Sequence, residues 1–205
     1  MSSSRKSKPG SSRARNKIYQ YVIFFLQPSF YVLPALIFFG SCESNEANQT
    51  NKPLYIDLKS YFNKQASELN ANNFRLKKFV LKDKESEDKI FDHPNWTEEL
   101  KPFSECDINK PSWKNSYSID STGDSQTLCI KYQAKDSTLK IKSINFCLEH
   151  DSITFIRIEK RTDNMYYGYT TTLNYFPMKA YSIQNAQKIS FSKEAMVEIK
   201  ALFLP

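Results

Sequence analysis

Residues 165–176 read MYYGYTTTLNYF, and this stretch is the strongest indication of the fold class. Large side chains with apolar surface alternate there with residues that are mostly small or polar. The first set is Met165, Tyr167, Tyr169, Leu173 and Tyr175, and the second is Tyr166, Gly168, Thr170, Thr172 and Asn174. Successive side chains of a β-strand point to opposite faces of a sheet. The pattern therefore predicts a strand with one buried face.

Similar alternation of β-branched and aromatic residues fills the chain after Trp113, interrupted by polar turns. It predicts strands near 116–120, 127–134, 139–149, 153–161, 165–176, 180–191 and 196–203. Connections this short join only antiparallel neighbours.

Two helices and a hairpin are predicted before this region. Apolar residues recur at steps of three, four and seven between Leu54 and Asn70, which is typical of an amphipathic helix. Residues 74–81 and 87–91 form a predicted hairpin around a charged tip. Residues 96–103 form a second helix that Asn95 caps and that Pro102 kinks or ends. The predicted class is α+β: two amphipathic helices packed on a twisted antiparallel β-meander, with an open half-barrel as a variant.

Charge is distributed unevenly along the 205 residues. The chain has 29 basic and 22 acidic side chains, and residues 1–42 hold six of the basic ones and none of the acidic ones. Residues 43–205 thus carry 23 basic and 22 acidic side chains. The net charge of +7 belongs mainly to the N-terminus, and the sequence predicts no basic patch for nucleic acid.

The N-terminus has the order of a secretory signal. A basic stretch ends at Lys17, residues 18–39 carry no charge, and Gly40, Ser41 and Cys42 follow. The uncharged run is also long enough to span a bilayer. Pro28 and Pro34 interrupt it, and these breaks favour a cleaved signal over a retained transmembrane helix.

The row Phe39-Gly40-Ser41-Cys42 resembles the lipobox of bacterial lipoproteins. The resemblance implies that residues 1–41 are a signal peptide and that Cys42 becomes the lipidated first residue, with acyl groups such as palmitate as its membrane anchor. It implies a location in the bacterial cell envelope, at the outer membrane. It does not distinguish the periplasmic face of that membrane from the cell surface. Residues 42–53 would then be a flexible tether and residues 54–205 one domain.

The body of the chain, roughly Leu54 to Phe203, resembles a family of small uncharacterised lipoproteins of Gram-negative bacteria. Three short segments carry this resemblance: Trp96 to Leu100, Asp107 to Pro111 followed by Trp113 and Tyr117, and Tyr175 to Pro177. It implies an envelope location and brings no known activity with it.

Residues suited to catalysis or cofactor binding are sparse after Cys42. Gly123 and Gly168 are the only glycines there, too few for a loop that binds phosphate. His93 and His150 stand outside any metal-binding or nucleophile motif. The sequence therefore predicts no catalytic residue, no metal and no cofactor.

Three cysteines follow Cys42. A turn centred between Asp136 and Ser137 would place Cys129 opposite Ile144 and leave Cys147 on the other face. That register makes a direct bridge between Cys129 and Cys147 unexpected. Two alternatives remain: a bridge from Cys106 to one of the strand cysteines, or unpaired thiols buried in the core.

Tyr167, Tyr169 and Tyr175 are the candidate ligand-facing residues, because side chains on one face could line a groove for a lipid, a sugar ring or a peptide. The alternative is that they belong to the core.

The leading hypothesis for the protein's function is a non-enzymatic, lipid-anchored binding or scaffold module. A carrier of an apolar ligand in a curved half-barrel and an enzyme built from scattered acids are the alternatives. The predicted partners are the membrane, through Cys42, and an unknown protein or apolar ligand, but no nucleic acid.

Overall fold

A computed structural model describes residues 53–82, 85–124, 126–163, 167–189 and 195–205. They belong to a compact unit, Thr50–Pro205. The predicted signal peptide at 1–41, the predicted lipidation site Cys42 and all of the predicted tether except Pro53 lie outside the described residues.

Two α-helices, a short 3-10 helix and nine strands make up the described part of the chain. The helical elements are α2 (Leu58–Ala71), α3 (Trp96–Ser104) and η1 (Pro111–Trp113). The strands are β1 (Arg75–Lys82), β2 (Glu85–Phe91), β3 (Tyr117–Gly123), β4 (Thr127–Ala134), β5 (Ile141–Glu149), β6 (Ser152–Asp163), β7 (Tyr167–Phe176), β8 (Ala180–Ile189) and β9 (Ala195–Leu204).

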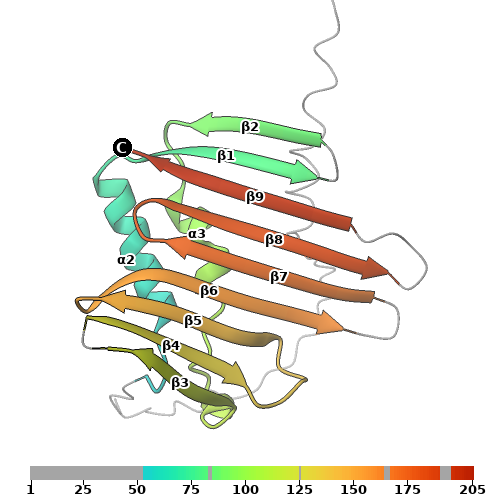
Figure 1. The fold of residues 1–205 in the computed structure, drawn as a ribbon. Coiled ribbons are helices and arrows are strands. Elements are labelled where there is room, and N and C mark those ends of the chain that lie inside the picture. The colour runs from blue at the N-terminus through green and yellow to red at the C-terminus, as the bar shows by residue number, and fades with distance from the viewer. Residues whose placement is uncertain (1–52, 83–84, 125, 164–166, 190–194) are drawn as a thin grey trace, which may run out of the picture. The chain divides into compact units, whose positions relative to one another are not determined.

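All nine strands form one open antiparallel sheet in the order β2-β1-β9-β8-β7-β6-β5-β4-β3. From β3 to β9 each strand lies beside the next one in sequence, and the β1–β2 hairpin joins the sheet at β9 (Figure 1). The sheet does not close, so β2 and β3 are its edges. The predicted α+β class is confirmed.

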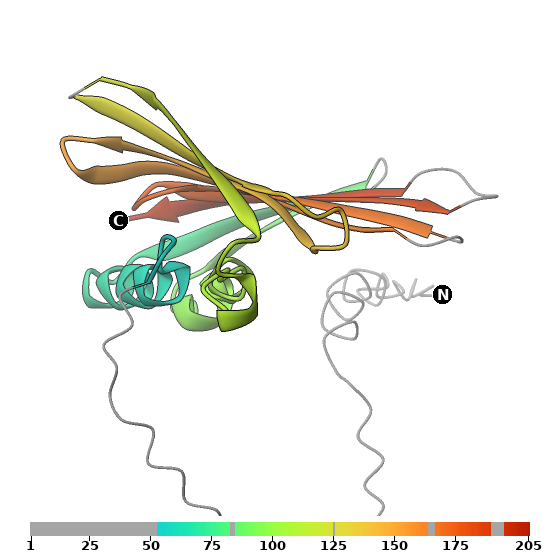
Figure 2. The ribbon, with the colours of Figure 1, turned by 90° about the horizontal axis from the view of Figure 1, so that it is seen from below.

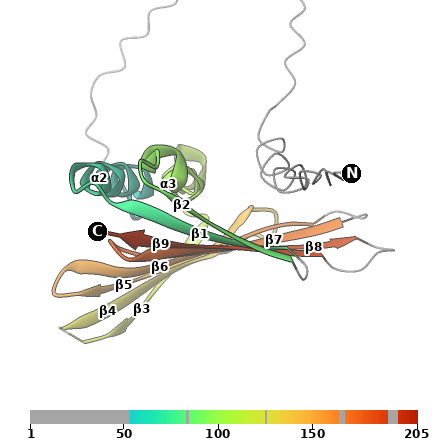
Figure 3. The ribbon, with the colours of Figure 1, turned by 90° about the horizontal axis from the view of Figure 1, so that it is seen from above.

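Both helices lie on the same face of the sheet (Figures 2 and 3). Each begins at the side chain of a capping residue, as is common for Asp and Asn. Asp57 Oδ1 accepts a hydrogen bond from Ser60 N at 2.9 Å, and Asn95 Oδ1 accepts one from Glu98 N at 3.3 Å. The second helix was predicted to kink or end at Pro102, and it ends two residues later at Ser104.

Aromatic side chains fill the interface between the helices and the sheet. Trp96, Phe62, Phe103 and Tyr175 are each 0–1% exposed. The ring of Tyr175 lies 4.9 Å from that of Phe62 and 5.7 Å from that of Phe103. Trp96, Leu100 and Phe103 are the buried residues of α3, as the spacing of the sequence predicts. These contacts hold both helices on the middle strands of the sheet.

The first helix begins at Leu58 and not at the predicted Leu54, because Tyr55 has another role. Its ring packs edge-on against Tyr117 and Tyr132, with centroids 5.7 and 5.3 Å away. Its backbone N–H donates to Asn109 Oδ1 at 3.0 Å. The chain before α2 is therefore fixed to the start of β3 and the end of β4.

We expect Phe103→Ala to lower the free energy of unfolding by about 3 to 5 kcal/mol, because it leaves a cavity between α2, α3 and β7. Denaturant unfolding of the purified protein measures this. Phe176→Ala is the control, since Phe176 is 42% exposed on the opposite face of the sheet, and should cost about 1 kcal/mol. Equal effects of the two substitutions would contradict the assignment of Phe103 to the core.

Candidate binding surface

The structure separates the three candidate tyrosines of β7. Tyr175 is 0% exposed, and its hydroxyl donates a hydrogen bond to Gln65 Oε1 of α2 at 2.9 Å. Burial raises the pKa of Tyr175 well above its ordinary value, so this hydroxyl stays a neutral donor. Tyr175 is thus a core residue that ties β7 to α2.

Tyr167 and Tyr169 lie on the same face of β7, further toward its start. They are 44% and 38% exposed, whereas Thr171, Leu173 and Tyr175 of the same face are buried. The helices cover only the second half of this strand. The ligand-facing role of Tyr167 and Tyr169 stays a prediction.

A charged cluster lies beneath α3. The Glu99 carboxylate of α3 accepts hydrogen bonds from Lys78 Nζ of β1, at 2.9 and 2.7 Å, and from the Tyr181 hydroxyl of β8, at 2.6 Å. Burial first, and the Glu99 charge second, hold the pKa of Tyr181 well above its ordinary value. Both carboxylate oxygens are engaged, and this arrangement attaches α3 to two strands. We interpret the cluster as structural.

The two histidines lie at different places in the fold. His93 is in the loop between β2 and α3, and His150 is in the β5–β6 turn, where it and Asp151 have positive φ angles of 50° and 62°. Within the part of the chain that the structure describes, no group of three or more His, Cys, Asp or Glu side chains could hold a metal ion.

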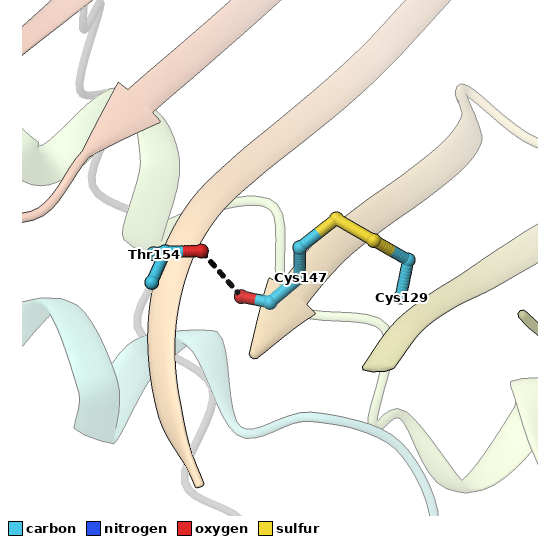
Figure 4. Close-up of a disulfide and its surroundings, with 3 residues drawn as sticks. All are labelled: Cys129, Cys147 and Thr154. Atoms are coloured by element: carbon cyan, nitrogen blue, oxygen red, sulfur yellow. Dashed lines mark hydrogen bonds between the residues drawn. A yellow bond between two sulfur atoms is a disulfide. The ribbon is translucent and has the colours of Figure 1, made fainter. Parts of the chain in front are cut away.

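Cys129 and Cys147 form a disulfide, which corrects the sequence prediction. Their sulfur atoms are 2.07 Å apart and their Cα atoms 4.0 Å apart. Cys129 of β4 is the direct register partner of Cys147 of β5 (Figure 4). The Oγ1 atom of Thr154, on β6, donates to the Cys147 carbonyl oxygen at 3.4 Å (Figure 4).

The register prediction was wrong because the β4–β5 turn is longer than expected. Asp136 Oδ1 accepts from Thr138 N at 2.7 Å, and Leu139 N donates to the Asp136 carbonyl oxygen at 3.3 Å. These bonds keep residues 135–140 in the turn, so β5 starts at Ile141 instead of 139. Ile144 consequently pairs with Tyr132 and not with Cys129.

Cys106 has no disulfide partner, so the alternative bridge from Cys106 to a strand cysteine is also wrong. Its side chain is buried just after the end of α3, and its Sγ atom donates to the Pro102 carbonyl oxygen at 3.1 Å. Burial raises the pKa of the Cys106 thiol to about 11. The thiol is therefore neutral and unreactive at ordinary pH.

The disulfide belongs to a row of side chains on the sheet face opposite the helices, all of them apolar except Lys77. Phe146 of β5 points into the core, so Cys147, the next residue, points to the other face. The register continues the row from strand to strand, from β4 to β2. Its members are Cys129, Cys147, Phe155, Phe176, Ala180, Leu202, Lys77 and Ile90.

Side chains of this row are close to one another and open to solvent. The rings of Phe155 and Phe176 lie 5.0 Å apart. Phe176, Leu202 and Ile90 are 42%, 45% and 49% exposed. Neighbouring strands lie about 4.8 Å apart, so members on adjacent strands form a continuous stripe. We call this set the open-face row.

A shallow groove of about 580 Å³ lies next to the open-face row, on strands β2, β1 and β9. Phe79 and Leu81 provide its apolar lining, and Asp88, Glu198 and Lys200 provide charge. Hydrogen bonds from Gln184 and Lys200 lower the pKa of Glu198, so this side of the groove holds an ion pair between Glu198 and Lys200. The open-face row and the groove together suit a partner with an extended apolar side and polar margins.

Comparisons with known proteins return no match: no family model, no curated protein and no solved structure is similar to this chain. Among the described residues, no helix has the length and apolar character that crossing a membrane requires.

We expect the double variant Cys129→Ala/Cys147→Ala to lose about 3 kcal/mol of unfolding free energy, because the bridge closes a loop of 18 residues. Denaturant unfolding measures the loss, with Cys106→Ala as a control that should change stability less.

Alkylation followed by peptide mapping checks the pairing independently. In the native protein at pH 8 no cysteine from 106 onward should be modified, whereas Cys106 alone should react once the chain is unfolded without reductant. Reaction of Cys129 or Cys147 under those conditions would contradict the disulfide.

Proposed function

We propose that this protein is a lipid-anchored lipoprotein of the bacterial cell envelope, held at the outer membrane through acyl chains on Cys42. The lipobox-like row that ends at Cys42 supports this proposal. The disulfide between Cys129 and Cys147 supports it independently, since disulfides persist in the periplasm and at cell surfaces and are rare in the cytosol.

We further propose that the protein acts without catalysis, as a binding or scaffold module. The observation that carries this proposal is the open-face row. Exposed apolar residues that are scattered singly are normal on soluble proteins, but a stripe that runs across the strands to exposed Phe176 and Leu202 is typical of an interaction surface. Lys77 separates Leu202 from Ile90, the last apolar member. The partner would be a protein or another molecule with an apolar side.

The finer description of the fold, two amphipathic helices on a twisted meander, is also part of the proposal. Burial of Leu58, Phe62, Ala66 and Leu69 on one side of α2 supports it. The carrier alternative needs a cavity between the helices and a curved half-barrel. Aromatic side chains occupy the described helix–sheet interface, which favours the scaffold over the carrier.

A photo-reactive amino acid placed at Leu202 tests the open-face row in living cells. We expect ultraviolet light to produce a discrete cross-linked product, because Leu202 lies in the middle of the row. The control is the same amino acid at Thr170, which is exposed on the same face but outside the row. Identical patterns from both positions, or no product from either, would speak against the row as a binding surface.

Replacing Cys42 with serine tests the anchor. Acylation needs the thiol, so we expect the precursor to remain uncleaved while the native protein begins at Cys42 with added acyl mass. Mass spectrometry of the N-terminus measures both. A native chain that retains residues 1–39 would show that this segment is a transmembrane anchor instead.

A further inference from the structure

Six lysines gather at one corner of the sheet, where η1 leads into β3, β4 ends and β5 begins. They are Lys110, Lys114, Lys135, Lys140, Lys142 and Lys160. Lys110, Lys114, Lys135 and Lys140 are exposed, and the other two are half-buried. We call this set the lysine corner. Figure 1 shows β5, β4 and β3 side by side at this end of the sheet, with β3 as the edge strand.

Hydrogen bonds place these residues close together although they span 50 positions of the sequence. Lys135 N donates to the Ser116 carbonyl oxygen at 2.9 Å, two residues from Lys114. The Lys142 carbonyl oxygen accepts from Gln133 Nε2 at 3.1 Å. The Lys140 carbonyl oxygen accepts from Arg161 N at 2.8 Å, which brings Lys160 beside the turn.

The charge of the lysine corner is not neutralised within the described part of the protein. None of its lysines has a described carboxylate oxygen within 4.0 Å, whereas Lys77 and Lys78 at the other edge pair with Asp88 and Glu99. Two acids lie nearby: Asp136 closes the β4–β5 turn, and Asp107 accepts hydrogen bonds from Asn109. The six lysines outnumber them. The corner therefore presents net positive charge to solvent.

The chain enters the domain at this same corner. Tyr55, the third described residue, donates its hydroxyl proton to the carbonyl oxygen of Lys114 at 2.9 Å. Its ring contacts Tyr117 and Tyr132, at the start of β3 and near the end of β4. Residues 43–52, which separate Cys42 from Pro53, reach at most about 36 Å when fully extended. An anchor at Cys42 would keep the lysine corner near the membrane surface.

We propose that the lysine corner binds anionic lipid headgroups of the membrane that carries the Cys42 anchor, and so orients the domain on it. This inference rests on the proposed anchoring. Several lysines within a Debye length of an anionic surface add attraction that a short acyl-linked tether alone does not supply, and they select one orientation. The open-face row, on the face away from the helices, then remains free for a partner.

Lysine acetylation by a water-soluble reagent tests the proposal on the native protein, reconstituted in vesicles of phosphatidylcholine with or without about 30% phosphatidylglycerol. We expect anionic vesicles to reduce modification of Lys114, Lys135 and Lys140 about threefold or more, and about 0.5 M NaCl to abolish the reduction. Lys179 and Lys188, exposed on β7–β8 and β8, are internal controls and should not change.

A matched pair of variants completes the test. Lys114→Glu/Lys135→Glu/Lys140→Glu should remove the lipid-dependent protection of the remaining corner lysines, Lys110, Lys142 and Lys160. Lys82→Glu/Lys179→Glu/Lys188→Glu changes the net charge equally and should preserve that protection. Equal loss in both variants would overturn the proposal in favour of a non-specific charge effect.

The intact mass of the same sample separates the two proposals. If Cys42 carries acyl groups but the corner lysines react equally in both kinds of vesicle, the headgroup surface is wrong and the anchor stands. If acyl groups are missing but anionic vesicles still protect the corner, the anchor is wrong and the headgroup surface stands. Equal protection in both kinds of vesicle would indicate a contact that does not depend on headgroup charge and would also overturn the proposal.

Discussion

The packing of Tyr175 against Phe62 and Phe103 is the interaction on which the rest of the fold depends. It joins a middle strand to both helices, and the Tyr175 hydroxyl finds a partner, Gln65, inside the core. A buried hydroxyl without a partner would cost more than the ring gains from an extra contact. Because this cluster lies at one half of the strands, the helices cover that half and leave Tyr167 and Tyr169 exposed.

Two helices on one face of a nine-stranded sheet leave the other face to solvent, and this asymmetry explains where the chain places its remaining apolar side chains. Most positions of the open face are polar, including Thr172, Asn174 and Ser182. The open-face row departs from that pattern along one line of register partners, and Phe79 and Leu81 of the neighbouring groove depart from it as well. The disulfide stands at one end of the row, where it joins β4 to β5 near the β3 edge of the sheet.

Local patterns predicted the elements, because strand alternation and helix spacing depend on neighbouring residues alone. The buried face of α3 and the seven strands after Trp113 follow from such patterns. Local patterns did not predict the disulfide, because the register of β4 and β5 depends on the hydrogen bonds that Asp136 makes inside the turn between them. The sequence pattern also could not separate Tyr175 from Tyr167 and Tyr169, because all three lie on the same face of β7. They differ only in whether the helices cover that part of the strand.

The same distinction applies to charge. The balance of 23 basic and 22 acidic side chains in residues 43–205 predicted no basic patch, and it is correct as an average. An average does not say which charged side chains lie close to one another in the folded protein. The acids of the β1–β2 hairpin and α3 pair with lysines beside them, such as Lys77 and Lys78, and so are not available elsewhere. An overall balance is compatible with six lysines at one corner, because the acids that balance them lie in other parts of the chain, and the topology brings these lysines together where the chain enters the domain.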